Sequence, residues 1–146
     1  MSDVFISYAR EDAEFVRRLH ESLANQGRDI WVDWEGIPPR AEWLAEIRAA
    51  IDSAESFVFI ISPDSVVSRI CTEELQHAVE RNKRIVPIVL REVETESVED
   101  ELAKLNWIFF RDSDHFDTSL KQLLTALDTD LELVRAHTRL LVRAVE

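Results

Sequence analysis

The stretch "SFVFIISPDSVVSRICTEEL", residues 56–75, decides the fold. Its opening "SFVFIIS" has no polar alternation, which is typical of a strand whose two sheet faces are both covered. The segment "CTEELQHAVERN", residues 71–82, has apolar residues at helical spacing. A covered strand followed by a loop and an amphipathic helix is the repeating unit of a parallel α/β sheet.

The same alternation runs along most of the chain. The pattern predicts five strands, at 3–8, 29–32, 56–62, 84–90 and the end of 101–110, and four helices, at 11–27, 41–54, 71–82 and 116–127. This is the pattern of a flavodoxin-like, doubly wound parallel sheet with strand order 2-1-3-4-5. We therefore predict one domain over residues 1–128. The remaining 129–146 form either a helix docked on that domain or a linker-like helix that leads into a longer protein.

Composition narrows the class of protein. The 146 residues, 46% of them hydrophobic, suffice for one domain with a full core. No apolar run is long enough to span a bilayer and no signal peptide is recognisable, so we expect a cytoplasmic protein without a membrane partner. The net charge of −12 argues against nucleic-acid binding, and two glycines are too few for either common glycine-rich phosphate loop. One cysteine excludes an internal disulfide.

The predicted topology itself places a site. Ligands of open α/β sheets bind beyond the carboxyl ends of the strands where the strand order reverses, here between the first and third strands. The loops after the first three strands should meet there. The first loop carries Ser7, Tyr8 and Arg10, the second carries Trp34 and Arg40, and the third carries Arg69. The arginines could bind phosphates, and Trp34 could stack on a base or a nicotinamide.

Two adjacent glutamates begin the predicted helix over 71–82. Glu73 and Glu74 differ by about 100° around a helix, so they cannot face the same way. Glu74 lies at the edge of the predicted buried stripe and is the better candidate for a functional carboxylate. The alternative is that both glutamates are there because acidic residues favour a helix N-terminus. Glu74 and His77 form a single Glu-x-x-His pair, which is too few ligands for a di-metal site, and no metal is expected.

Several of these segments together resemble the successive boxes of a TIR domain, most closely those of bacterial members. They are "DVFISYARED", "WVDWEGIPPRAEWLAEIRAAI", "FVFIISPDSVVSRICTEEL" and "NKRIVPIVL", and the likeness extends over about residues 1–127. The final residues are similar to the linker helix that follows bacterial TIR domains. The resemblance implies one of two functions: cleavage of NAD+ in immune or cell-death signalling, or a non-catalytic module that signals by self-association.

The resemblance also assigns roles to residues. It implies that Glu74 is the catalytic carboxylate of an NAD+ glycohydrolase or cyclase, with NAD+ as a consumed substrate and no cofactor. Residues implied to bind substrate are Ser7, Tyr8, Arg10, Asp33, Trp34, Arg40 and Ile70. Many active members have tryptophan where this chain has Ile70, so either the aromatic wall for nicotinamide is missing or Trp34 supplies it. Nucleoside deoxyribosyltransferases also use a glutamate on a flavodoxin-like fold and are a weaker alternative.

Overall fold

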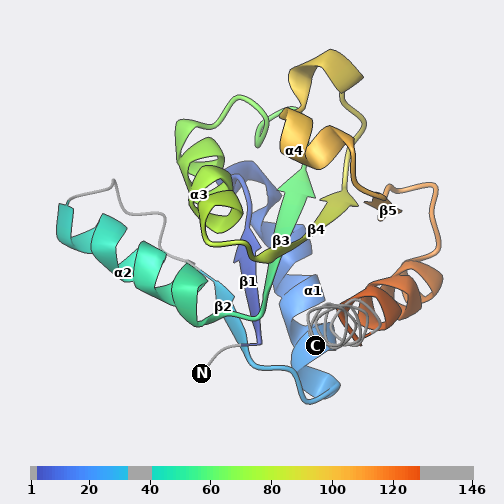
Figure 1. Ribbon diagram of the computed structural model, residues 1–146. Helices are drawn as coiled ribbons and strands as arrows, with labels where there is room; N and C mark the ends of the chain where they lie inside the picture. The colour runs from blue at the N-terminus through green and yellow to red at the C-terminus, as the bar shows by residue number, and fades with distance from the viewer. Residues whose placement is uncertain (1–2, 33–40, 129–146) are drawn as a thin grey trace, which may run out of the picture.

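The computed structural model describes residues 3–32 and 41–128, and the statements below concern those residues. Five parallel strands form one sheet in the order β2-β1-β3-β4-β5, as predicted (Figure 1). The strands are β1 (Val4–Ser7), β2 (Ile30–Val32), β3 (Ser56–Ile61), β4 (Arg84–Val89) and β5 (Ile108–Phe109). The predicted order and the class of fold are therefore confirmed.

Helices cover both faces of this sheet. They are α1 (Ala13–Asn25), α2 (Ala41–Ser53), α3 (Arg69–Glu80), α4 (Asp100–Ala103) and a helix over 116–128, with short 3-10 turns η1 (Arg10–Asp12) and η2 (Thr95–Ser97). Helices α2, α3 and α4 lie on one face, and α1 and the helix over 116–128 lie on the other (Figure 1). Sequence reasoning missed α4, because one turn of helix is too short to show a periodic pattern.

The alternation of strand side chains divides the core in two. All six residues of β3 are buried. Phe57, Phe59 and Ile61 join the core layer under α2 and α3, whereas Val58 and Ile60 join the layer under α1. Burial on both faces explains why the strand reads as one continuous apolar run in the sequence.

The turns after α1 and α3 show how these helices end. The N–H of Gly27 bonds to the carbonyl of Ala24 and that of Arg28 to Leu23, the paired bonds of a Schellman cap. Gly27 has φ +81°, and the equivalent residue after α3, Asn82, has φ 55°. Glycine and asparagine are the residues that adopt this left-handed backbone at least cost.

Gly27→Ala is expected to lower the free energy of unfolding by about 1 kcal/mol. No atom lies within 4 Å of the added Cβ, so the cost comes from the backbone conformation alone. Urea unfolding measures it. The matched control is Asn82→Gly, which should leave stability unchanged or raise it, since glycine relieves the same conformation. Equal stability of Gly27→Ala and the natural protein would contradict the left-handed backbone conformation of Gly27.

Candidate functional site

The candidate site lies at the carboxyl edge of the sheet, where β1, β3 and α3 meet. Helix α3 begins at Arg69, and the Ser68 hydroxyl caps it by accepting from the N–H of Cys71 at 3.3 Å. The helix was predicted to begin at Cys71, so that boundary was two residues late. The earlier start places Glu73 and Glu74 in the second turn, and no acidic residue occupies the first turn. A preference for acidic residues at the helix N-terminus therefore explains these glutamates less well than expected.

Glu74 makes a long-range contact with β1. The Ser7 hydroxyl donates to Oε1 of Glu74 at 2.8 Å, in a partly buried setting. Ser7 is the last residue of β1 and is 1% exposed. The first strand and the helix after the third strand thus bring together two of the residues that the sequence placed in one cleft. The chain runs from β1 to β2 on one side of β1 and then to β3 on its other side, so the strand order reverses between β1 and β3. The bond joins the end of β1 to the helix that follows β3, and it therefore lies at this point of reversal.

Glu73 has a different environment, as helical geometry predicted. Its carboxylate accepts from Nε of Arg69 at 3.1 Å, one turn earlier on the helix. The side chains of Arg69 and Glu73 are 91% and 42% exposed, so the pair lies in solvent and contributes little to stability. Arg69, a candidate phosphate ligand from the sequence, thus pairs with Glu73 on the exposed surface of α3.

Cys71 is a near neighbour of both Ser7 and Glu74. It is 1% exposed, and burial raises the pKa of its thiol to about 11, with the nearby Glu74 carboxylate adding to the shift. The hydroxyls of Ser68 and Ser7 interact with the thiol and oppose the shift. A thiol in this setting stays protonated at neutral pH and acts as a small apolar core residue.

The Cys71 thiol is expected to react with a disulfide reagent at pH 8 at least about 100-fold more slowly in the native protein than in urea, because a pKa near 11 leaves about a hundredth of the usual thiolate. The release of the coloured thiol from the reagent follows the reaction. Since Cys71 is the only cysteine of the chain, the signal is unambiguous. Similar rates in both states would show that the thiol is accessible.

A second group of polar side chains ties three strand ends together. The carboxylate of Asp12, whose side chain is 2% exposed, accepts from the Ser62 hydroxyl at 2.5 Å and from Arg91 at 2.8 Å. Arg91 also pairs with Asp64, and both contacts raise the pKa of its guanidinium, that of Asp64 most. No sequence motif distinguishes Asp12 or Arg91. Asp12 follows Arg10 and Glu11 in a charged run, where nothing in the sequence distinguishes a buried acid from a solvated one.

The other candidate residues fall into two groups. Tyr8 is partly buried against the core, Arg10 is exposed in η1, and Ile70 is 38% exposed at the start of α3. Ile70 stands four residues before Glu74, and Val67, 79% exposed, lies just before α3. Asp33, Trp34 and Arg40 lie outside the described residues, as does the predicted C-terminal helix over 129–146.

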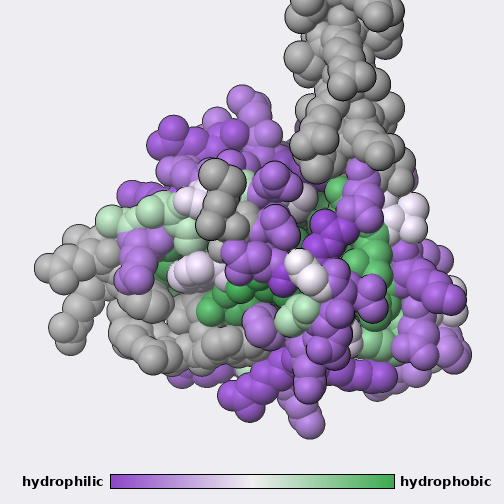
Figure 2. All heavy atoms as spheres, turned by 90° about the horizontal axis from the view of Figure 1, so that it is seen from below, coloured by the Kyte–Doolittle hydropathy of each residue, from purple (hydrophilic) through white to green (hydrophobic). Residues whose placement is uncertain are grey.

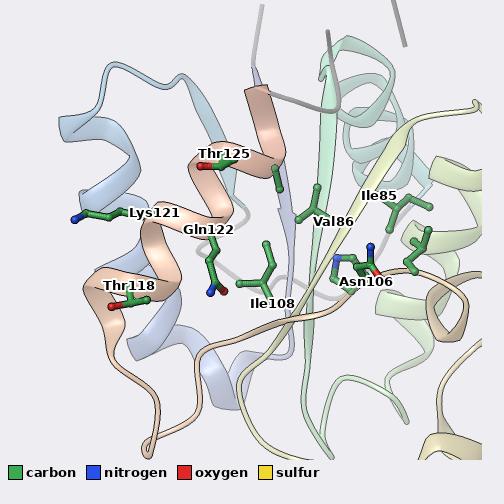
Figure 3. Close-up of a pocket in the computed structure, with 11 residues that line it drawn as sticks. Ile85, Val86, Asn106, Ile108, Thr118, Lys121, Gln122 and Thr125 are labelled. Carbon is green, nitrogen blue, oxygen red and sulfur yellow. The ribbon is translucent and has the colours of Figure 1, made fainter. Parts of the chain in front are cut away.

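A pocket of about 640 Å³ lies at another place in the fold, between β4, β5 and the helix over 116–128 (Figure 3). Ile85, Val86 and Ile108 form its apolar wall, and Lys121 and Gln122 come from the helix. It contains none of the predicted site residues. The amino edge of the sheet, opposite the candidate site, presents mainly hydrophilic side chains, with apolar side chains exposed between them in more than one place (Figure 2).

Within 3–32 and 41–128, no three histidine, cysteine or acidic side chains gather as metal ligands. Over the same residues, no helix is both long enough and apolar enough to cross a membrane. The described candidate residues of the site offer a carboxylate, hydroxyls, the guanidinium of Arg10 and apolar side chains.

Comparison with known proteins agrees with the boxes found in the sequence. The family model described as "TIR domain" matches residues 4–124. The chain belongs to the TIR domain family. No curated protein shows significant similarity to it.

Solved TIR domains share the fold. The TIR domain of the Toll-related receptor TRR-2 from Hydra magnipapillata is 26% identical, with a TM-score of 0.74 over 88% of this chain and 99% of that one. The TIR domains of the activated Roq1 resistosome, which recognises the pathogen effector XopQ, are 19% identical, with a TM-score of 0.69 over 87% of this chain and 99% of that one. The TIR domain heterodimer of RPS4 and RRS1 gives 17% identity and a TM-score of 0.67 over 88% and 97% of the two chains.

Proposed function

We propose that this TIR domain is an NAD+ nucleosidase that cleaves the bond between nicotinamide and ribose, with Glu74 as its catalytic carboxylate. The observation that carries the proposal is the hydrogen bond from Ser7 to Glu74 at the carboxyl edge of the sheet, where this class of fold binds its ligands. The TIR resemblance supplies the substrate. The product is ADP-ribose when water attacks, or cyclic ADP-ribose when a group of the same molecule attacks.

One carboxylate meets the demands of this reaction. A glycosidase ordinarily needs a second carboxyl group to protonate its leaving oxygen. Nicotinamide leaves NAD+ as a neutral molecule from a cationic ring, so it needs no proton. The remaining demand is to stabilise the positive charge that develops on the ribose, and a fixed carboxylate in a site with little water does this electrostatically.

The proposal includes self-association and a role in bacterial immune or cell-death signalling within the cytoplasm. The resemblance to bacterial members supports this setting, and the heterodimer of RPS4 and RRS1 shows TIR domains paired with one another. Arg10 and Arg40 are proposed to hold the phosphates of NAD+. Tyr8, Asp33, Trp34 and Ile70 are proposed to line the cleft.

A second candidate function is a non-catalytic interaction module. Val67 and Ile70 favour it, because both are exposed apolar side chains beside the site and Ile70 stands where many active members have tryptophan. The exposed apolar surface formed by Val67 and Ile70 suits a contact with another protein at least as well as it suits the binding of nicotinamide.

The test is loss of NAD+, followed by chromatography over a range of protein concentrations, with light scattering to report assembly. Glu74→Ala is compared with Glu73→Ala, which removes the neighbouring carboxylate from the solvent-exposed pair. We expect turnover that rises with assembly, is lost in Glu74→Ala and persists in Glu73→Ala. Assembly without turnover would favour the interaction module. Equal turnover in both variants would refute the role of Glu74.

A further inference from the structure

Ser7 combines near-complete burial with a polar contact to the proposed catalytic group. It is 1% exposed, so its hydroxyl offers almost no surface to a ligand arriving from solvent. That hydroxyl carries a single proton, which it donates to Oε1 of Glu74 at 2.8 Å. The hydroxyl also interacts with the Cys71 thiol, but that thiol is itself 1% exposed, so the effect of Ser7 on chemistry at this site passes through Glu74.

The surroundings of Ser7 are rigid. The residue closes β1 and pairs in register with Phe59 of β3, which is 2% exposed. Five residues further along the chain, Asp12 binds the Ser62 hydroxyl just beyond the end of β3. The segment that carries Ser7 is thus bound to β3 through the sheet and again through Asp12.

Glu74, in contrast, is a long side chain on a helix and is only partly buried. Such a side chain samples several rotamers unless a partner selects one. A hydrogen bond to an ionised carboxylate is among the stronger ones in proteins and prefers a narrow geometry. The buried hydroxyl at the end of a rigid strand is suited to selecting one orientation of the carboxylate.

We propose that Ser7 is a positioning residue: its hydroxyl holds the Glu74 carboxylate in the orientation that the reaction needs, and it does not bind substrate itself. This inference rests on the proposed function for its kinetic consequence, and it replaces the substrate-binding role that the family resemblance implies. The contact with Glu74 can be measured independently of any activity.

The kinetic test is Ser7→Ala. We expect kcat to fall by about 10- to 100-fold, the value of one hydrogen bond to a charged group, while KM changes by less than about threefold. Ser7→Thr, which keeps the hydroxyl, should recover most of the loss. Ser56→Ala is the matched control, because Ser56 is also a buried strand serine, 4% exposed. It is the first residue of β3 and so lies at the amino edge of the sheet, away from the candidate site. This control variant should retain the natural kcat.

Three kinetic results would overturn the proposal. A raised KM with an unchanged kcat would make Ser7 a substrate contact. Equal losses in Ser7→Ala and Ser56→Ala would reduce its role to packing. No recovery in Ser7→Thr, in a protein as stable as Ser7→Ala, would show that the hydroxyl is not what matters.

A double-mutant cycle, measured by urea unfolding, tests whether Ser7 and Glu74 interact in the folded protein. Ser7→Ala, Glu74→Ala and the double variant are compared with the natural protein, and we expect the midpoint shifts of the single variants to sum to more than that of the double variant. Additive shifts would overturn the inference, whatever the kinetics. If the natural protein consumes no NAD+, the proposed function fails. A non-additive cycle would still support the inference that Ser7 orients the Glu74 carboxylate.

Discussion

Replacing Arg91, whose side chain is 48% exposed, with alanine is expected to lower the free energy of unfolding by about 2 kcal/mol, because the change removes a charged hydrogen-bond donor from the buried Asp12 carboxylate. The Asp12 side chain is 2% exposed, and among the described residues its carboxylate accepts hydrogen bonds from Ser62 and Arg91. With Arg91 gone, one neutral hydroxyl remains to stabilise that carboxylate. Domains of this size are stable by roughly 5–15 kcal/mol, so the loss is a large share.

Asp64→Ala is the matched control for Arg91→Ala. It removes the other acidic partner of Arg91, but Asp64 is 38% exposed and its loss leaves the contact with Asp12 in place. Exposed ion pairs contribute little, so we expect a cost of about 0.5 kcal/mol. Urea unfolding of both variants under one set of conditions measures the difference.

The double variant Asp12→Asn with Arg91→Ala separates stranded charge from lost contacts. It removes both members of the ion pair, so the buried carboxylate charge at position 12 is gone. We expect it to be more stable than Arg91→Ala alone by about 1 kcal/mol. If Arg91→Ala costs no more than Asp64→Ala, the ion pair with Asp12 is not a determinant of stability.

The strands could be predicted from the sequence because a strand buried on both faces appears as a short, continuous run of apolar residues. β3 is covered on both faces by different helices, and its six residues are accordingly apolar or small. Strand–helix alternation then restricts the topology to a parallel doubly wound sheet. The boundary of α3 was less predictable, because its first turn contains the polar Arg69 and the exposed Ile70, neither of which marks a buried face.

The candidate site could be predicted in part. Helical geometry separated Glu74 from Glu73, and the structure gives them different partners, Ser7 in the first case and Arg69 in the second. The pairing of Ser7 with Glu74 could not be predicted, because 67 residues separate them in the chain and no local pattern encodes the contact. The same reason explains why Asp12 and Arg91, 79 residues apart, were missed.

Glu74→Gln is expected to reduce NAD+ turnover by a factor on the order of 10²–10³, comparable with removing one fixed electrostatic group from other active sites. Glutamine has the size and shape of glutamate, and its amide oxygen can still accept the hydroxyl of Ser7. The variant therefore keeps the contact with β1 and loses only the negative charge. Urea unfolding should show a fold of nearly natural stability.

The comparison of Glu74→Gln with Glu73→Gln isolates the position of the charge. Both changes raise the net charge of the chain by one and alter neighbouring residues of one helix, but Glu73 lies in a solvent-exposed pair with Arg69. Screened by water, that carboxylate has little influence on a charge developing in the cleft. Glu73→Gln should thus keep turnover within about twofold of the natural protein. If Glu74→Gln retains more than about a tenth of the natural rate, the negative charge is not the source of catalysis. Since the glutamine preserves the hydrogen bond from Ser7, the side chain's shape and contacts would then be what the site requires.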